Sequence, residues 1–172
     1  SADVIHSFWI PEVHHKIDLI PGQKNEIRLE ADLPGVYRGV CAEFCGLQHA
    51  LMHFLLVVMP SDRFDMWLEQ ERSPALPPPS PQAALGQEVF LSSSCVYCHQ
   101  IRGTPAAGSV GPDLTHIGSR FTIGAGILPN NRGNMGGWIS DPQHLKPGVY
   151  MPATELTGQQ LQALLAYLDS LK

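Results

Sequence analysis

Hydrophobic and polar positions alternate along the first part of the chain. The alternation at 17–19 and again at 26–30, separated by a Pro-Gly pair, predicts two strands joined by a turn. Residues 36–40 and 54–59 are rich in β-branched and aromatic side chains and predict further strands. A helix is expected at 61–71. This pattern favours a small β-sandwich or barrel built from short elements.

The second part of the chain follows a helical period instead. Its last helix is predicted to begin after Thr157, with Gln160 completing a capping box. An apolar stripe at helical spacing then follows: Leu161, Leu164, Leu165 and Leu168. Another helix is expected at 81–93. The stretch 103–137 has little periodicity, and wrapping around a large cofactor is one reason for so long a loop in a compact domain.

A proline-rich segment separates these two patterns. Residues 72–81 contain five prolines in ten positions. Such a run favours extended polyproline geometry and acts as a semi-rigid spacer. We therefore expect a first domain at 1–71, a linker at 72–82 and a second domain at 83–172.

Composition narrows the classes of function. The 172 residues are 44% hydrophobic and 16% charged, which is typical of a globular protein. The net charge of -5 disfavours nucleic acid as a partner, because phosphate neutralisation needs a basic face. The longest apolar stretch, 54–59, is far shorter than the roughly 20 residues of a membrane span. No signal peptide is expected, since Asp3 and His6 interrupt the opening residues.

The second cysteine pair lies in a haem-attachment signature. Cys95, Cys98 and His99 form a C-x-x-C-H sequence, in which two thiols bond the porphyrin vinyl groups and the histidine is an axial ligand. A redox-active C-x-x-C or half of a zinc site is the alternative, but zinc would lack its remaining ligands. An electron-transfer haem usually has a methionine on its other face. Met151, in a proline-braced loop, is favoured over Met135, whose glycine-rich segment is expected to be too flexible.

Residues 83–172 resemble a class I bacterial cytochrome c. The resemblance rests on four segments: Cys95-Val-Tyr-Cys98-His99, Gly111-Pro-Asp-Leu114, Trp138-Ile-Ser-Asp-Pro142 and Met151-Pro152. It implies an all-α fold around a covalently bound haem c, held by Cys95, Cys98, His99 and Met151. It also implies that the Pro112 carbonyl orients His99 and that Trp138 lies near the haem propionates.

The first cysteine pair belongs to a denser cluster. Cys41, Cys45, His49 and Met52 fall within twelve residues, and soft sulfur with imidazole is the ligand set that copper prefers. A mononuclear blue copper site uses one cysteine and two histidines. Two metals bridged by both thiolates explain the extra cysteine better, and they require a second histidine.

Four histidines are candidates for that second imidazole: His6, His14, His15 and His53. His6 lies on an apolar strand end, where a histidine needs a partner, and is favoured. His53 leads into a strand and is expected to point away. His14 and His15 lie in a polar loop and are expected to be solvated.

The segment 1–60 resembles the dinuclear copper (CuA) domain of cytochrome c oxidase subunit II. The matching segments are Asp3-Val-Ile-His6-Ser-Phe, Ile20-Pro-Gly22 and Cys41-x-Glu43-x-Cys45-Gly-x-x-His49-x-x-Met52. By position, His6 and His49 would each bind one copper, Cys41 and Cys45 would bridge the pair, and Met52 and the Glu43 carbonyl would be weak ligands. The Glu43 carboxylate would face a magnesium ion shared with subunit I. Nitrous oxide reductase carries a similar copper site, but Glu43 and Gly46 follow the oxidase pattern.

This resemblance also implies a cupredoxin-like Greek-key barrel. The family has two membrane helices and several strands before the segment on which this chain begins. We therefore expect an N-terminally incomplete barrel with an exposed edge that other polypeptide covers.

Together, the two resemblances predict the electron-transfer subunit II of a caa-type cytochrome c oxidase. It would relay electrons from a cytochrome c or a quinol-oxidising complex through haem c and copper to haem a in subunit I, where oxygen is reduced to water. Subunits I and III would be its partners, on the extracytoplasmic face of a bacterial membrane. The alternatives are a free extracytoplasmic electron carrier or copper-handling protein, and a structural module with a Cys41–Cys45 disulfide and a sensory haem.

Overall fold

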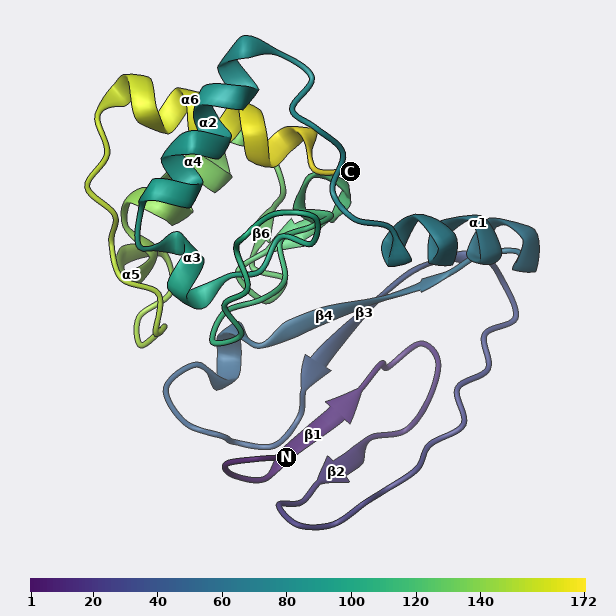
Figure 1. Ribbon diagram of the computed structural model, residues 1–172. Coiled ribbons are helices and arrows are strands. Elements are labelled where there is room, and N and C mark those ends of the chain that lie inside the picture. The colour runs from purple at the N-terminus through teal and green to yellow at the C-terminus, as the bar shows by residue number, and fades with distance from the viewer.

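The computed structural model describes residues 1–172, which form a strand-rich first part and a helical second part (Figure 1). The first part contains β1 (His6–Trp9), β2 (Ile17–Leu19), β3 (Gly35–Cys41), a short 3-10 helix η1 (His49–Leu51), β4 (His53–Val58) and α1 (Ser61–Arg72). The second part contains α2 (Pro81–Ser92), α3 (Cys95–Cys98), η2 (Ile117–Ser119), β5 (Thr122–Ile123), β6 (Leu128–Pro129), α4 (Arg132–Ser140), α5 (Pro142–Leu145) and α6 (Gly158–Ser170).

The four strands of the first part form one open sheet in the order β2-β1-β3-β4, and every neighbouring pair is antiparallel. The strands expected at 17–19, 36–40 and 54–59 are confirmed by β2, β3 and β4, and the expected helix by α1. The pairing of β1 with β3 sets Phe8 opposite Cys41. This register brings the end of β3 beside β1, on which His6 lies.

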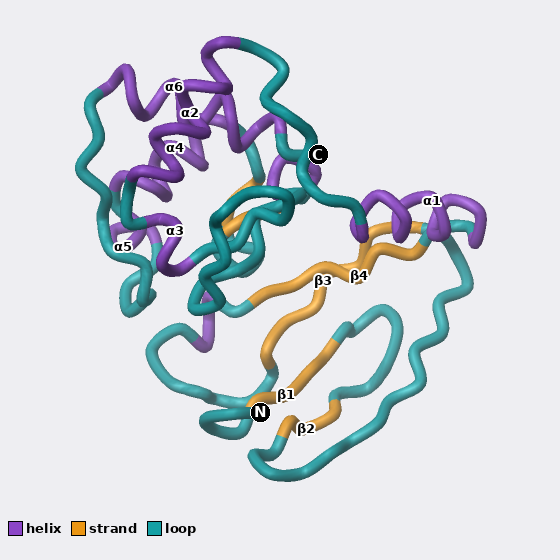
Figure 2. Tube along the Cα trace, in the orientation of Figure 1, coloured by secondary structure: helices purple, strands orange, loops and turns teal.

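The strand expected at 26–30 is wrong. These residues lie in the long loop between β2 and β3 (Figure 2). Ile27 and Leu29 are half-buried and alternate with exposed charged residues, so the pattern itself is real. A strand also needs a neighbour for its backbone groups, and no strand pairs with this segment.

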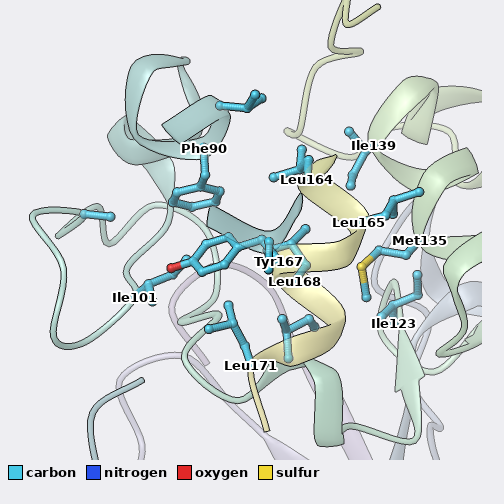
Figure 3. Packing of buried hydrophobic residues seen from close by; sticks show 14 residues of the cluster. Phe90, Ile101, Ile123, Met135, Ile139, Leu164, Leu165, Tyr167, Leu168 and Leu171 are labelled. Carbon is cyan, nitrogen blue, oxygen red and sulfur yellow. The ribbon is translucent and has the colours of Figure 1, made fainter. Parts of the chain in front are cut away.

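The core of the second part lies where α2 and α6 cross. Tyr167 and Leu164 of α6 pack there with Phe90 of α2, as Figure 3 shows. A β-carbon on Gly86 would lie 2.0 Å from the Ala163 carbonyl oxygen, so only glycine permits this crossing. Both helices were predicted, at 81–93 and after Thr157, and both are confirmed. The Thr157–Gln160 capping box is present as well.

The stretch 103–137 is more ordered than its composition suggested. It contains the β5–β6 hairpin, η2 and the first part of α4. Met135 lies on α4 and is buried against Leu165 and Ile123 (Figure 3), so the expectation of a flexible segment is wrong there. The Asn131 side chain accepts a hydrogen bond from the Asn134 amide and caps this helix, which offsets the low helix propensity of its glycines.

The linker is held along part of its length. The guanidinium of Arg102 donates to the carbonyls of Glu71 and Arg72, at the end of α1. The Ala75 amide donates to the Arg102 carbonyl over 2.9 Å, and a ring nitrogen of the buried His116 lies 3.1 Å from the Ser73 carbonyl. The first linker residues therefore lie against the second part of the chain.

None of the helices combines the length and the apolar character that crossing a membrane requires.

Candidate metal centres

The two cysteines of the first pair face each other at the end of the sheet. Cys41 is the last residue of β3, and the loop that follows returns Cys45 to it, with 3.7 Å between the two Sγ atoms. Both thiols are free, and a disulfide would need about 2.05 Å between the sulfur atoms. The structure therefore has no Cys41–Cys45 disulfide, which the structural-module alternative required.

The two histidines flank this pair on opposite sides. The Nδ1 atom of His6 lies 3.7 Å from Cys41 Sγ, and the Nδ1 atom of His49 lies 3.7 Å from Cys45 Sγ. Ligand atoms of His6, Cys41 and Cys45 all lie within 4.8 Å of one another. For bonds of about 2.0–2.3 Å, the lengths that imidazoles and thiolates make to zinc, neighbouring ligands of a tetrahedral metal lie roughly 3.3–3.8 Å apart. The spacing therefore fits metal ligation.

Asp3 contacts the His6 ring on the side away from Cys41. Its carboxylate Oδ1 lies 3.0 Å from His6 Nε2, while Nδ1 faces Cys41. A carboxylate on the second ring nitrogen fixes the tautomer and orientation of a ligating histidine. We did not assign Asp3 this role from the sequence, although an acidic residue three positions before the histidine is the signal that could have shown it.

The electrostatics of the two thiols differ. Burial raises the pKa of Cys41, but hydrogen bonds with the backbone at Glu43 and Ser7 outweigh it, so that the pKa is lowered to about 6. Burial and then the neighbouring Cys41 raise the pKa of Cys45. The lowered pKa of Cys41 favours its thiolate, which is the form that binds metal.

Glu43 and Met52 lie at the edge of this cluster. The Glu43 carbonyl oxygen lies 3.3 Å from Cys41 Sγ, whereas its carboxylate is exposed, 3.9 Å from Lys16 Nζ. Met52 is half-buried and lines an open cavity of about 380 Å³ together with His6 and Cys41. Of the oxygen atoms of Glu43, it is the main-chain carbonyl that lies beside the sulfur cluster.

The other histidines lie elsewhere. His53 opens β4 and lines a different cavity, with Arg38 and Gly126. His14 and His15 lie in the loop between β1 and β2, with their ring centroids 3.8 Å apart. None of the three belongs to the group of ligand atoms around Cys41 and Cys45.

The second centre is built around His99, which follows α3. Its Nδ1 atom lies 2.8 Å from the Pro112 carbonyl oxygen. Donation from Nδ1 to that carbonyl leaves Nε2 with a free lone pair, the arrangement that an axial iron ligand needs. A β-carbon on Gly111 would lie 2.6 Å from the His99 ring, so the chain turns closely around the imidazole. Cys95 and Cys98 bound the single turn of α3 as free thiols.

The two candidate methionines are placed differently. Met135 lies inside the core, whereas Met151 is half-buried at its edge, in the loop before α6. The side chain of Gln143 donates to the Val149 carbonyl and accepts from the Gly148 amide over 3.1 Å. This side chain braces the loop that carries Met151. Trp138 is half-buried on α4 and packs against the core.

The donor sets fit the expected groups. Two thiols and two imidazoles in a chain of 3.7 Å contacts suit soft metals such as copper. The helix-borne thiol pair, with an oriented imidazole directly after it, suits a covalently attached haem.

Comparison with known proteins gives matches over nearly the whole chain. Residues 83–172 match the family described as cytochrome c, and residues 1–59 match the periplasmic domain of cytochrome c oxidase subunit II. Cytochrome c oxidase subunit 2 of Alkalihalophilus pseudofirmus is 46% identical over 173 residues. The same-named proteins of Bacillus sp. strain PS3 and Bacillus subtilis are 39% and 33% identical, each over 183 residues.

These matches cover 100% of this chain but only 50%, 51% and 51% of the three relatives. The chain thus spans about half the length of the curated relatives it matches. A crystal structure of the periplasmic domain of subunit II of cytochrome oxidase from Bradyrhizobium japonicum is 43% identical. The match covers 40% of this chain and 49% of the chain in that crystal structure. Its TM-score of 0.39 is too low for a comparison of folds.

A strand-rich region of the cupredoxin-like subunit II type is thus followed by a helical cytochrome c domain. The chain belongs to the cytochrome c oxidase subunit II family, in the form in which a cytochrome c domain follows the periplasmic domain.

Proposed function

We propose that this chain is the electron-entry part of a caa-type cytochrome c oxidase, with a copper domain at 1–71, a linker at 72–82 and a cytochrome c domain at 83–172. The observation that carries the proposal is the unbroken series of 3.7 Å contacts from His6 through Cys41 and Cys45 to His49. It provides two sulfur atoms between two imidazoles, which is what a pair of bridged metals requires.

Each residue of the first centre has a distinct task in this proposal. Cys41 and Cys45 bridge two coppers, and His6 and His49 each complete the ligand set of one. Met52 and the Glu43 carbonyl are weak ligands, and the Glu43 carboxylate binds magnesium at the contact with subunit I. A copper pair held there would supply one-electron transfer, and a strand and a short loop would limit the movement of its ligands.

The second centre holds a haem c. Cys95 and Cys98 bond the porphyrin, His99 is the proximal ligand and Met151 is the distal one. The Pro112 carbonyl keeps the His99 ring in one orientation, as its 2.8 Å contact with Nδ1 supports. Gln143 keeps the loop of Met151 in place, because it bonds two of that loop's backbone groups.

The residues of this chain would hold a haem and a copper pair, and these groups would pass electrons from a donor protein towards haem a of subunit I. Oxygen binds and is reduced to water in that subunit, so this chain performs no proton chemistry. Subunits I and III are the partners of the chain, on the extracytoplasmic face of a bacterial membrane. The names of the curated relatives, all subunit 2 of the oxidase, support this assembly.

Paramagnetic resonance combined with metal analysis tests the copper assignment. The oxidised protein should show hyperfine structure from two equivalent copper nuclei, with two copper and one iron atom per chain. Cys45→Ser should remove the shared-electron signal, because one bridge is lost. His14→Ala is the matched control and should leave the signal unchanged, since His14 lies outside the cluster. Zinc in place of copper, or a single-copper pattern, would contradict the assignment.

Co-purification tests the place in the oxidase. The chain, expressed within its full-length protein, should retain subunit I through a membrane extraction. Recovery of the full-length protein alone, with both metal centres intact, would favour a free electron carrier instead.

A further inference from the structure

The second domain contacts the first domain at two places and the start of the linker at a third, and the three contacts are built alike. Three of the six glycines with positive φ, Gly103, Gly126 and Gly148, face residues from the first 80 positions. A β-carbon on them would lie 3.0 Å from Pro74, 2.8 Å from His53 and 2.9 Å from Leu47, respectively. At each place the backbone approaches the other part of the chain more closely than a side chain would allow.

A hydrogen bond crosses the boundary beside each of these glycines. The acceptor is always the carbonyl of the preceding residue. Ala75 N donates to the Arg102 carbonyl over 2.9 Å, and His53 N donates to the Ala125 carbonyl over 3.0 Å. Gln48 Nε2 donates to the Pro147 carbonyl over 3.2 Å. Three separate left-handed turns thus present one outward carbonyl each to the first domain and the start of the linker.

Lys146 ties two of these turns together. Its side chain is only 4% exposed, and its Nζ donates to the Gly124 carbonyl over 3.1 Å. The turn at 124–126 and the loop at 146–148 are therefore parts of one surface. Ala125, between the two glycines, has a φ of 62°, the only positive value outside glycine in the chain. Such a conformation costs about 1–2 kcal/mol, so it persists where surrounding contacts over-determine it.

We propose that these three glycine turns are a docking surface for the first domain and the start of the linker, and that docking holds the two metal centres in one fixed arrangement. This inference rests on the proposed function for its meaning in electron transfer. On the first domain the contacts fall at Leu47, Gln48 and His53, which flank His49 and Met52 in the chain. On the second domain, Pro147 and Gly148 lead directly to Met151. Docking therefore places the segment that carries His49 and Met52 against the loop that carries Met151.

Because the linker is short, even weak contacts between the two domains are enough to keep them docked. A short tether gives the two domains an effective concentration of about 1 mM. At that concentration, contacts worth about 4.1 kcal/mol already balance separation. The end of α1 is also fixed by Arg102, so the tether starts from the docking surface itself. Figure 1 shows the first residues of β4 beside the loops of the second domain, as the His53–Ala125 bond requires.

Two glycine substitutions separate docking from backbone strain. Gly126→Ala places a β-carbon against His53, whereas Gly22→Ala places one in open space. The two positions have similar φ values, 81° and 74°, so both substitutions introduce the same kind of backbone strain. The difference between the two variants therefore reports the contact with His53.

The first measurement is hydrogen exchange at the His53 amide in the haem-loaded protein. Gly126→Ala should accelerate it at least about tenfold relative to Gly22→Ala, which corresponds to about 1.4 kcal/mol of lost docking. Gln48→Ala removes only one side-chain hydrogen bond, leaves every backbone conformation unchanged and should accelerate the same exchange severalfold. Equal exchange in Gly126→Ala, Gln48→Ala and Gly22→Ala would overturn the docking surface. This result is independent of the metal in the first domain.

The second measurement is the rate of electron transfer from flash-reduced haem to copper within one molecule. Gly126→Ala should slow it while both optical spectra remain unchanged, and Gly22→Ala should not. Unchanged rates in Gly126→Ala with accelerated His53 exchange would overturn the link between docking and transfer. Absence of the two-copper signal in the unaltered protein would instead contradict the proposed function, and the hydrogen-exchange result would remain valid.

Discussion

The two domains of this chain are stabilised in different ways. Among residues 1–80, only Ser7, Ile10 and Gly39 are buried. The second domain contains a contiguous cluster of 14 buried hydrophobic residues between its helices. Hydrophobic burial within its own core therefore stabilises the second domain. The first domain depends more on strand pairing, on its metal ligands and on its contacts with the second.

The rigidity of the two proposed metal sites therefore has different sources. The proposed haem ligands are attached to a packed core, whereas the proposed copper ligands lie on an open sheet with little core beneath it. Since metal ligands in a thinly packed region are ordered partly by the metal, binding and folding are coupled there.

Copper removal should have the largest effect, and it should affect mainly the first domain. In haem-loaded protein prepared without copper, the amides of β1 and β3 should lose several kcal/mol of protection, because His6, Cys41 and Cys45 no longer bind a common metal. Hydrogen exchange measures this loss, and haem absorbance during denaturation reports the second domain, which should unfold at an unchanged midpoint. Equal destabilisation of both domains on copper removal would contradict the prediction that only the first domain depends on copper for its stability.

Two methionine substitutions should separate core packing from haem ligation in the second domain. Met135 is buried in the core, so Met135→Ala should cost about 2–5 kcal/mol of unfolding free energy and keep the low-spin His/Met spectrum. Met151→Ala should abolish that spectrum at a smaller cost, since Met151 is only half-buried. Denaturant titration and optical spectra measure the two effects. The opposite pairing of effects would move the distal ligand to Met135.

Asp113 should give the smallest effect. Burial raises its pKa, but hydrogen bonds from Thr115 and then the charges of Arg102 and Arg120 outweigh this, so the pKa is lowered. A depressed carboxyl pKa stabilises the fold above the unfolded value of about 3.9, and this contribution is lost as the pH falls through the folded value. Because the carboxylate is partly exposed, Asp113→Asn should cost less than about 1 kcal/mol at pH 7.

Denaturant titrations at pH 7 and at about pH 2.5 measure this cost, which should shrink at the lower pH. A cost for Asp113→Asn that is the same at both pH values would exclude the carboxylate charge as its cause.

Much of this architecture could be predicted from local patterns. Thr157 and Gln160 lie three residues apart, so their capping box is visible in the sequence and is present in the structure. The segment 26–30 misled because alternation reports which side chains face inward, whereas a strand also needs a partner that alternation cannot show. Met135 was placed in a flexible segment because its glycines hid a helix that Asn131 caps.

The candidate ligands were also accessible from the sequence, because Cys41, Cys45 and His49 are close together in it. His6 is distant in sequence and was predicted only because a second copper would need a second imidazole. The structure places it beside Cys41. Asp3, Lys146 and the three glycine turns were not predicted. Their roles depend on which segments meet in space, and that information is absent from any short window of sequence.

The crossing of α2 and α6 also has a kinetic meaning. It joins the first and last helices of the second domain through Gly86 and Ala163, and the proposed haem-binding residues all lie in the segment between these helices. Closing a longer loop adds only a logarithmic entropy cost, but contacts so distant in sequence slow folding. We therefore expect the α2–α6 contact to limit the folding rate of this domain, since it closes the whole segment that carries His99 and Met151.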